Sequence, residues 1–188
     1  SGHDVLIGSR ELEKGKEVAI SLGLSESAGM LNIDAAQSCE IACLTVPFAH
    51  QEATLLSIGN SLNTKIMIDA TVPLMPPKVM RVQLPEDGSA ALKAQSILGE
   101  GVTVISAFQN ISAELLQTDK EIDCDVLVTG DLLDARNTVI GLVQDAGLTG
   151  WHAGPLCNSV AAEALTSILI AINKKHSLAH SGIKITGH

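Results

Sequence analysis

Short apolar runs alternate along the chain with longer segments in which apolar residues recur every three or four positions. The short runs are apolar on both faces, which is typical of strands buried in a parallel sheet. The longer segments have the period of amphipathic helices. The pattern predicts strands over residues 4–9, 39–47, 64–73, 101–108, 123–130 and 148–154. It predicts helices over residues 11–23, 49–62, 89–100, 131–147 and about 156–178.

This alternation of strands and helices predicts an α/β fold with a doubly wound, mostly parallel sheet. Ser89 and Asp131 stand where helix caps are expected, and the proline-dense residues 74–88 are predicted to form a loop. We expect residues 1–188 to form a single dinucleotide-binding α/β domain. It would end in the long apolar helix, about 156–178, and a short tail.

The first predicted strand runs directly into a serine and an arginine. In dinucleotide-binding folds, an arginine after the second strand accommodates the 2′-phosphate of NADP, whereas Asp or Glu there selects NAD. Arg10 offers a planar fork of donors, Ser9 a short hydroxyl donor, and Lys14 a further charge one turn into the helix. The pattern favours NADP, and the alternative is an ordinary solvated arginine after a strand.

The chain has no G-x-G-x-x-G sequence between a predicted strand and a helix. Gly99 and Gly101 come close, but they precede a strand and are predicted to form a turn. If residues 4–9 are the second strand, the first strand, the phosphate loop and the first helix should lie upstream. Because a βαβ unit takes ~30 residues, we expect an N-terminal truncation on the order of 20–25 residues.

Two predicted strands end in the same three residues. Thr45-Val46-Pro47 closes one and Thr71-Val72-Pro73 closes the next. Ligands of open parallel sheets bind at the carboxyl ends of the strands, so the repeat indicates a stiff ligand-binding shelf. The alternative is that both prolines merely terminate their strands.

The composition of the chain excludes some classes of binding partner. With 21 acidic and 12 basic residues the net charge is −9, which argues against nucleic acid. No run of about 18 apolar residues occurs, so no membrane partner is expected. The four cysteines lack a C-x-x-C spacing, which favours small buried residues over metal ligands. Reduced thiols and the absence of a signal-peptide pattern predict a cytoplasmic protein.

The segments GHDVLIGSR, LTVPFAH, DATVPL, SAFQNISAELL, DCDVLVTGD and AGPLCNS, in this order, resemble NADPH-dependent reductases of the 8-hydroxy-5-deazaflavin coenzyme F-420. The resemblance covers nearly the whole chain. It implies a Rossmann-type fold that binds NADP(H), with coenzyme F-420 as co-substrate and direct hydride transfer between the two rings. Members of this family usually carry an arginine soon after the Asn-Ser of the last segment, where this chain has Val160.

The resemblance also implies a set of cofactor-binding residues, without a catalytic acid or base and without a metal. The 2′-phosphate would be held by Ser9, Arg10 and Lys14. The path from adenosine to nicotinamide would be lined by Thr45, Val46, Pro47 and His50, although His50 equally suits a helix cap. The nicotinamide would lie near Val72 and Pro73. The deazaflavin would contact Asn110 and Ile111, with Gly154 and Pro155 nearby.

Three functions remain open from the sequence. The first is hydride transfer between NADP(H) and coenzyme F-420. The second is a truncated, non-catalytic relative that dimerises or only binds cofactor. The third is another NADP-dependent reductase acting on a small carbonyl or imine. The last helix is apolar around most of its girth, which predicts a homodimer, and burial within one subunit is the alternative.

Overall fold

The computed structural model describes residues 2–118 and 121–187 of the chain. In these residues the strands are β1 (Ile7–Ser9), β2 (Gly29–Leu31), β3 (Ile41–Leu44), β4 (Ile66–Asp69), β5 (Thr103–Ser106), β6 (Asp125–Val128) and β7 (Thr149–His152). The α-helices are α1 (Leu12–Ser21), α2 (Asn32–Ser38), α3 (Phe48–Ile58), α4 (Ala90–Leu98), α5 (Ala113–Leu116), α6 (Leu133–Asp145) and α7 (Ser159–His176). Short 3₁₀ turns are η1 (Glu26–Ala28), η2 (Gly59–Leu62) and η3 (Leu156–Asn158).

The strands pair in three parallel groups: β1 with β2, β3-β4-β5 in that order, and β6 with β7. A bridge joins the last two groups, because Ser106 and Thr129 exchange two backbone hydrogen bonds of 2.9 and 3.0 Å. Strands separated by helices and paired in parallel confirm the predicted α/β class.

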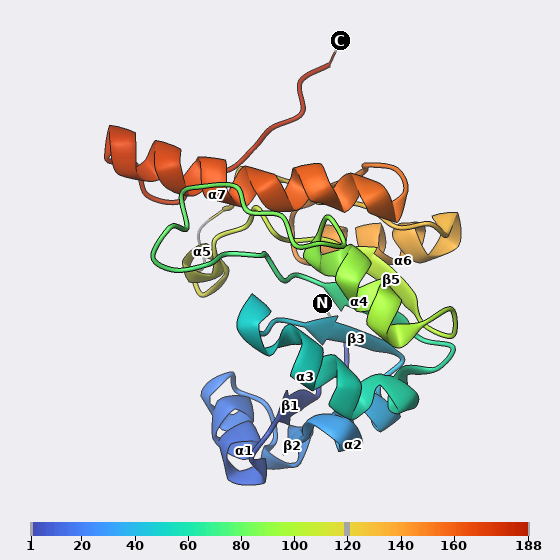
Figure 1. Ribbon diagram of the computed structural model, residues 1–188. Coiled ribbons are helices and arrows are strands. Elements are labelled where there is room, and N and C mark those ends of the chain that lie inside the picture. The colour runs from blue at the N-terminus through green and yellow to red at the C-terminus, as the bar shows by residue number, and fades with distance from the viewer. Residues whose placement is uncertain (1, 119–120, 188) are drawn as a thin grey trace.

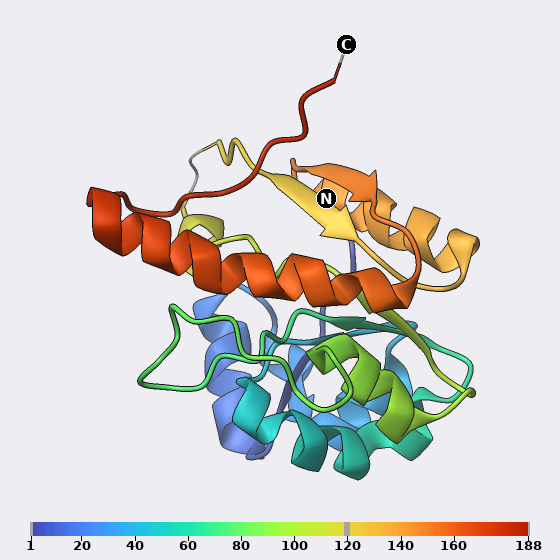
Figure 2. The same cartoon turned by 45° about the horizontal axis from the view of Figure 1, so that its top comes forward.

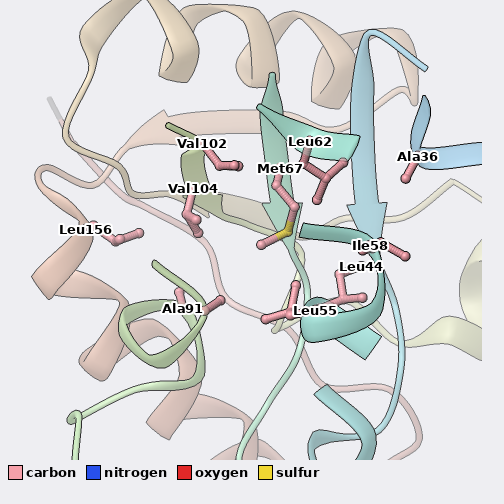
Figure 3. Close-up of a cluster of buried hydrophobic side chains, with 11 residues drawn as sticks. Ala36, Leu44, Leu55, Ile58, Leu62, Met67, Ala91, Val102, Val104 and Leu156 are labelled. Atoms are coloured by element: carbon pink, nitrogen blue, oxygen red, sulfur yellow. The ribbon is translucent and has the colours of Figure 1, made fainter. Parts of the chain in front are cut away.

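Apolar side chains alternate between the two faces of the β3-β4-β5 sheet. Met67 and Val104 point to one face, where they join Leu55 of α3 and Ala91 of α4 in a buried cluster (Figure 3). Ile105, one residue further along β5, points to the opposite face and joins a second cluster beneath α6. The sheet is thus covered on both faces over β4 and β5, as their two-sided apolar pattern predicted.

Helix α7 crosses the molecule beside α4 (Figures 1 and 2). The continuous helical stretch Leu156–His176 is long and apolar enough to span a membrane by length and composition alone, which the search for apolar runs in the sequence did not predict. In this structure one side of the helix packs inward, with Ser159 and Glu163 buried. The opposite side carries exposed apolar residues, among them Ile168 and Ile172.

One predicted cap is confirmed and the other is wrong. The hydroxyl of Ser89 accepts a hydrogen bond of 3.0 Å from the backbone N–H of Leu92 and caps α4. Asp131 does not cap α6, which begins at Leu133 without a side-chain cap. Its carboxylate instead accepts a hydrogen bond of 2.9 Å from the N–H of Leu156, because the chain before α7 returns to this strand end.

The cysteines are only partly buried. Cys124 is buried and Cys39 half-buried, but Cys43 and Cys157 are exposed, so the expectation of four buried residues is wrong for these two. Cys43 lies on β3, which pairs on one side only within the described residues, while α6 covers the sheet over β5 and β6. Cys157 is exposed because it lies in the turn before α7.

Candidate cofactor site

The carboxyl ends of three strands are level. Leu44 of β3 is in register with Asp69 of β4, and Asp69 is in register with Ser106 of β5. The residues that follow, 45–47, 71–73 and 109–111, therefore leave the sheet at one edge, and we call them the ledge. The structure thus brings together the two Thr-Val-Pro segments that the sequence singled out, together with Asn110 and Ile111.

The second Thr-Val-Pro segment is mostly buried and is held by a hydrogen bond to Asp69, the last residue of β4. Thr71 and Pro73 are buried, and Val72 is half-buried. The carboxylate of Asp69 accepts a hydrogen bond of 2.8 Å from the N–H of Thr71 and another of 2.6 Å from the side-chain amide of Gln51. By contrast, Thr45 and Pro47 of the first segment are exposed. The ledge therefore has a rigid inner part and an open outer part.

Asn110 and Ile111 lie in the turn after β5. The Asn110 side-chain amide is buried. It donates a hydrogen bond of 2.6 Å to the backbone carbonyl of Asp125 and another of 3.2 Å to Sγ of Cys124. Both contacts fasten the turn to the start of β6 and use the amide donors within the protein. Ile111 is half-buried, and its N–H donates to the carbonyl of Phe108 at 3.1 Å.

Gly154 and Pro155 follow β7 at the neighbouring strand ends. The carbonyl of Gly154 accepts 3.1 Å from the N–H of Gly130, just after β6. Gly154 has φ +92°, and an added Cβ would lie 2.6 Å from Nδ2 of Asn158. The positive φ strains any other residue at this position, which accounts for the glycine. Pro155 is exposed.

Ser9, Arg10 and Lys14 lie at the end of β1 and the start of α1. Arg10 and Lys14 are exposed, and within residues 2–118 and 121–187 no salt bridge engages either of them. The Ser9 hydroxyl accepts a hydrogen bond of 3.3 Å from the N–H of Glu11. Two cations and a hydroxyl suit a phosphate. Because β1 pairs with β2 alone in the described residues, no strand pairing joins this cluster to the ledge.

His50 lies in the first turn of α3 with an exposed side chain. The helix begins after Pro47 and has no side-chain cap, so the alternative that His50 caps it is wrong. The imidazole is available to a ligand beside the outer part of the ledge.

A buried polar network beneath the ledge was missed in the sequence. It consists of Gln51, Asp69, Gln109 and Glu163, each less than a tenth exposed. Its signal in the sequence was an acidic residue inside an apolar run, in IMIDATV and in VAAEAL. Burial raises the pKa of Asp69, against the hydrogen bonds from Thr71 and Gln51. Burial also raises the pKa of Glu163, to about 7, against the bonds from Ala90 and Ala91.

Two surface hollows lie away from the ledge. One is lined by residues of α3 and α4, including Leu56 and Leu98, and the other by residues around Leu116 and Leu148. Neither is lined by a residue predicted to bind cofactor.

Solved structures with the same arrangement first define the fold. The chain superposes with a TM-score of 0.79 on a putative F420-dependent NADP reductase from Arthrobacter sp. FB24, at 22% identity, covering 99% of this chain and 90% of that one. An imine reductase from Bacillus cereus gives a TM-score of 0.55 at 15% identity, covering 94% of this chain and 55% of that one. The chain therefore shares an α/β, Rossmann-type fold with both structures.

Sequence relatives then define the family. The family model "NADP oxidoreductase coenzyme F420-dependent" matches residues 1–73. The F420-dependent NADP reductase of Methanothermobacter marburgensis is 37% identical over 198 aligned residues, covering 99% of this chain and 88% of the relative. The F420-dependent NADP reductase of Methanocaldococcus jannaschii is 34% identical over 195 aligned residues, covering 97% of this chain and 87% of the relative. The chain belongs to the F420-dependent NADP reductase family, which confirms the predicted resemblance.

Proposed function

We propose that this protein transfers a hydride between NADP(H) and coenzyme F-420. The observation that carries the proposal is membership of the family, supported by a rigid ledge at the level ends of three parallel strands. In this proposal residues 1–188 act as one dinucleotide-binding domain. When bound, the nicotinamide and the deazaflavin supply the hydride donor and acceptor.

The protein's own part is binding, orientation and exclusion of water. Ser9, Arg10 and Lys14 supply the donors that suit the 2′-phosphate of NADP(H). The remaining proposed contacts run along the ledge and its neighbours: Thr45, Val46, Pro47, His50, Val72, Pro73, Asn110, Ile111, Gly154 and Pro155. No acid or base is needed for direct hydride transfer between two rings, so we assign none.

The test is a direct assay of the purified protein with NADPH and oxidised F-420, following loss of the visible absorbance of the deazaflavin. We expect turnover with NADPH and a much slower reaction with NADH. Separate spectrophotometric titrations with each cofactor accompany the assay. Binding of either cofactor without turnover would support the non-catalytic alternative. Reduction of a small imine or carbonyl by NADPH, with no reaction of F-420, would support the third function considered above, another NADP-dependent reductase.

We also propose a homodimer formed through the outer side of α7. Ala161, Leu165, Ile168 and Ile172 follow one another at spacings of four, three and four residues, and three of the four are exposed. This spacing is that of a seam between two helices. The free thiols also agree with a reducing, cytoplasmic location.

The dimer makes a prediction for Ile168. Replacing it with Lys places a charge in the seam, so we expect monomers where the unchanged protein forms dimers. Sedimentation velocity at several protein concentrations measures this. Leu56→Lys, on an exposed apolar residue of α3, is the matched control and should leave the mass unchanged. A dimeric Ile168→Lys protein would contradict the proposed interface.

A further inference from the structure

The inward side of α7 carries polar side chains that reach the ledge from behind. Glu163 is 1% exposed, and Thr166, three residues on, is half-buried. Such groups cost free energy to bury unless they are bonded. Both are bonded, and each begins a chain of contacts that leads to the same residue of β4.

The first chain of contacts passes through α4. The carboxylate of Glu163 accepts hydrogen bonds of 2.7 and 3.1 Å from the N–H groups of Ala90 and Ala91, the first two residues of that helix. The carbonyl of Ala90 accepts 2.9 Å from the side-chain amide of Gln51. The same amide donates a hydrogen bond of 2.6 Å to the carboxylate of Asp69, and this carboxylate also accepts one from the backbone N–H of Thr71. Glu163 is thereby connected to the inner part of the ledge.

The second chain of contacts passes through the turn after β5. The hydroxyl of Thr166 donates 2.8 Å to the backbone carbonyl of Gln109. The side-chain amide of Gln109 donates a hydrogen bond of 2.7 Å to the backbone carbonyl of Asp69 and another of 2.8 Å to the hydroxyl of Ser106. Both chains therefore meet at Asp69, and together they link α7 to residues 71–73 and to residues 109–111.

We propose that Glu163 and Thr166 are positioning residues for hydride transfer, which act through Asp69 to fix the two parts of the ledge relative to each other. The inference rests on the proposed function, in which residues 71–73 face one ring and residues 110–111 face the other. Neither α7 side chain contacts a cofactor in this proposal. Their effect is on alignment, and a displacement of about 1 Å at reacting atoms can cost on the order of 10²-fold in rate.

The test compares three substitutions on the same side of one helix. Glu163→Gln replaces one acceptor oxygen by an amide that faces the N–H donors of α4. Thr166→Val removes the hydroxyl while keeping the shape of the side chain. Ser167→Ala is the matched control, because Ser167 is buried but bonds to the carbonyl of Arg81 in the loop before α4.

Steady-state assays would give kcat and KM for NADPH, and NADPH deuterated at the transferred position would give the isotope effect on kcat. We expect kcat to fall on the order of 10²-fold for Glu163→Gln. For Thr166→Val we expect a fall of about tenfold. KM for NADPH should stay within about twofold, because Arg10 lies elsewhere, and the isotope effect should rise as hydride transfer limits the rate. Ser167→Ala should resemble the unchanged protein.

Amide hydrogen exchange without cofactor provides an independent reading. We expect faster exchange at Thr71 and at Ile111 in both variants. A fall in kcat that matches a smaller folded fraction, with an unchanged isotope effect, would overturn the inference, as would equal behaviour of Thr166→Val and Ser167→Ala. If Glu163→Gln does not fold, Thr166→Val decides alone. An inactive unchanged protein whose variants still loosen the ledge would instead refute the proposed function and leave the connection through α7 standing.

Discussion

At the scale of single residues, Arg10 is where the choice between the two nicotinamide dinucleotides is proposed to lie. It is exposed after β1 with no salt bridge in the described residues. A hydrogen bond between charged partners contributes about 1.5–3 kcal/mol, so Arg10→Ala should raise KM for NADPH about 10- to 100-fold. KM for NADH should change far less, because NADH lacks the 2′-phosphate.

Steady-state kinetics with both dinucleotides measures this preference. Lys175→Ala, which removes an exposed cation from the end of α7, is the control and should leave both KM values unchanged. An equal loss with NADPH and NADH would contradict the assignment of Arg10 to the 2′-phosphate.

Glu163 makes stability depend on pH. Burial raises its pKa from 4.5 to about 7, so the folded protein keeps a proton where the unfolded chain has lost it. Stability from this group is complete below about pH 4.5 and is lost as the pH rises through about 7. The full effect is about 3 kcal/mol, at 1.36 kcal/mol per unit. Asp69, whose pKa is also raised, acts in the same direction.

We therefore expect the free energy of unfolding in urea to fall between about pH 5 and about pH 8. Glu163→Gln, which is neutral at every pH, should make this dependence shallower. Glu100→Gln, on an exposed residue, should leave it unchanged. A slope that is the same in the unchanged protein and in Glu163→Gln would show that Glu163 titrates normally.

At the scale of elements, strands and helices with strong apolar periodicity were predictable. Every predicted strand and helix has a counterpart, with ends that shift by a few residues. The strand β2 and the helices α2 and α5 were missed, because they are short and their residues show no clear period. Gly29 of β2 fits against the backbone of α1, where an added Cβ would lie 2.4 Å from Lys16. Such a contact between distant segments leaves no local pattern.

The two predicted caps illustrate the same limit. Ser89 bonds within its own helix, so its role followed from the local sequence. Asp131 bonds to Leu156, which lies 25 residues away, and only the tertiary fold places that N–H beside it. Of the candidate site, the two Thr-Val-Pro segments were predictable for the same reason as Ser89, and Asn110 and Ile111 followed from the family resemblance. The network of Gln51, Asp69, Gln109 and Glu163 was not, because its members come from four separate segments.

Asp131→Ala tests which helix this carboxylate supports. We expect a loss of about 1 kcal/mol in the free energy of unfolding, since one partly buried hydrogen bond is removed. Amide exchange should become faster at Leu156 and stay unchanged in the first turn of α6. Asp134→Ala, in that first turn, is the control. Faster exchange in α6 alone would restore Asp131 as a helix cap.

At the scale of the whole molecule, α7 belongs to both the interior and the outer surface. Its polar side fastens α4 and the turn after β5, and its apolar side is where we propose that a second copy of the chain binds. The parallel α/β architecture was predictable, because it depends on the alternation of elements. How β1 lies relative to the ledge was not, because no strand pairing in the described residues connects them.

The tail after α7 is fastened to Asp125 of β6, which also bonds to the chain's single tryptophan. The carboxylate of Asp125 accepts a hydrogen bond of 2.8 Å from the indole N–H of Trp151 and another of 2.8 Å from the backbone N–H of Ile185. The Lys184 ammonium group forms a salt bridge of 3.0 Å with the same carboxylate. Because the chain has one Trp and no Tyr, its ultraviolet emission comes almost entirely from this place. The protein thus contains its own fluorescent probe, which reports release of the C-terminal segment without any added dye.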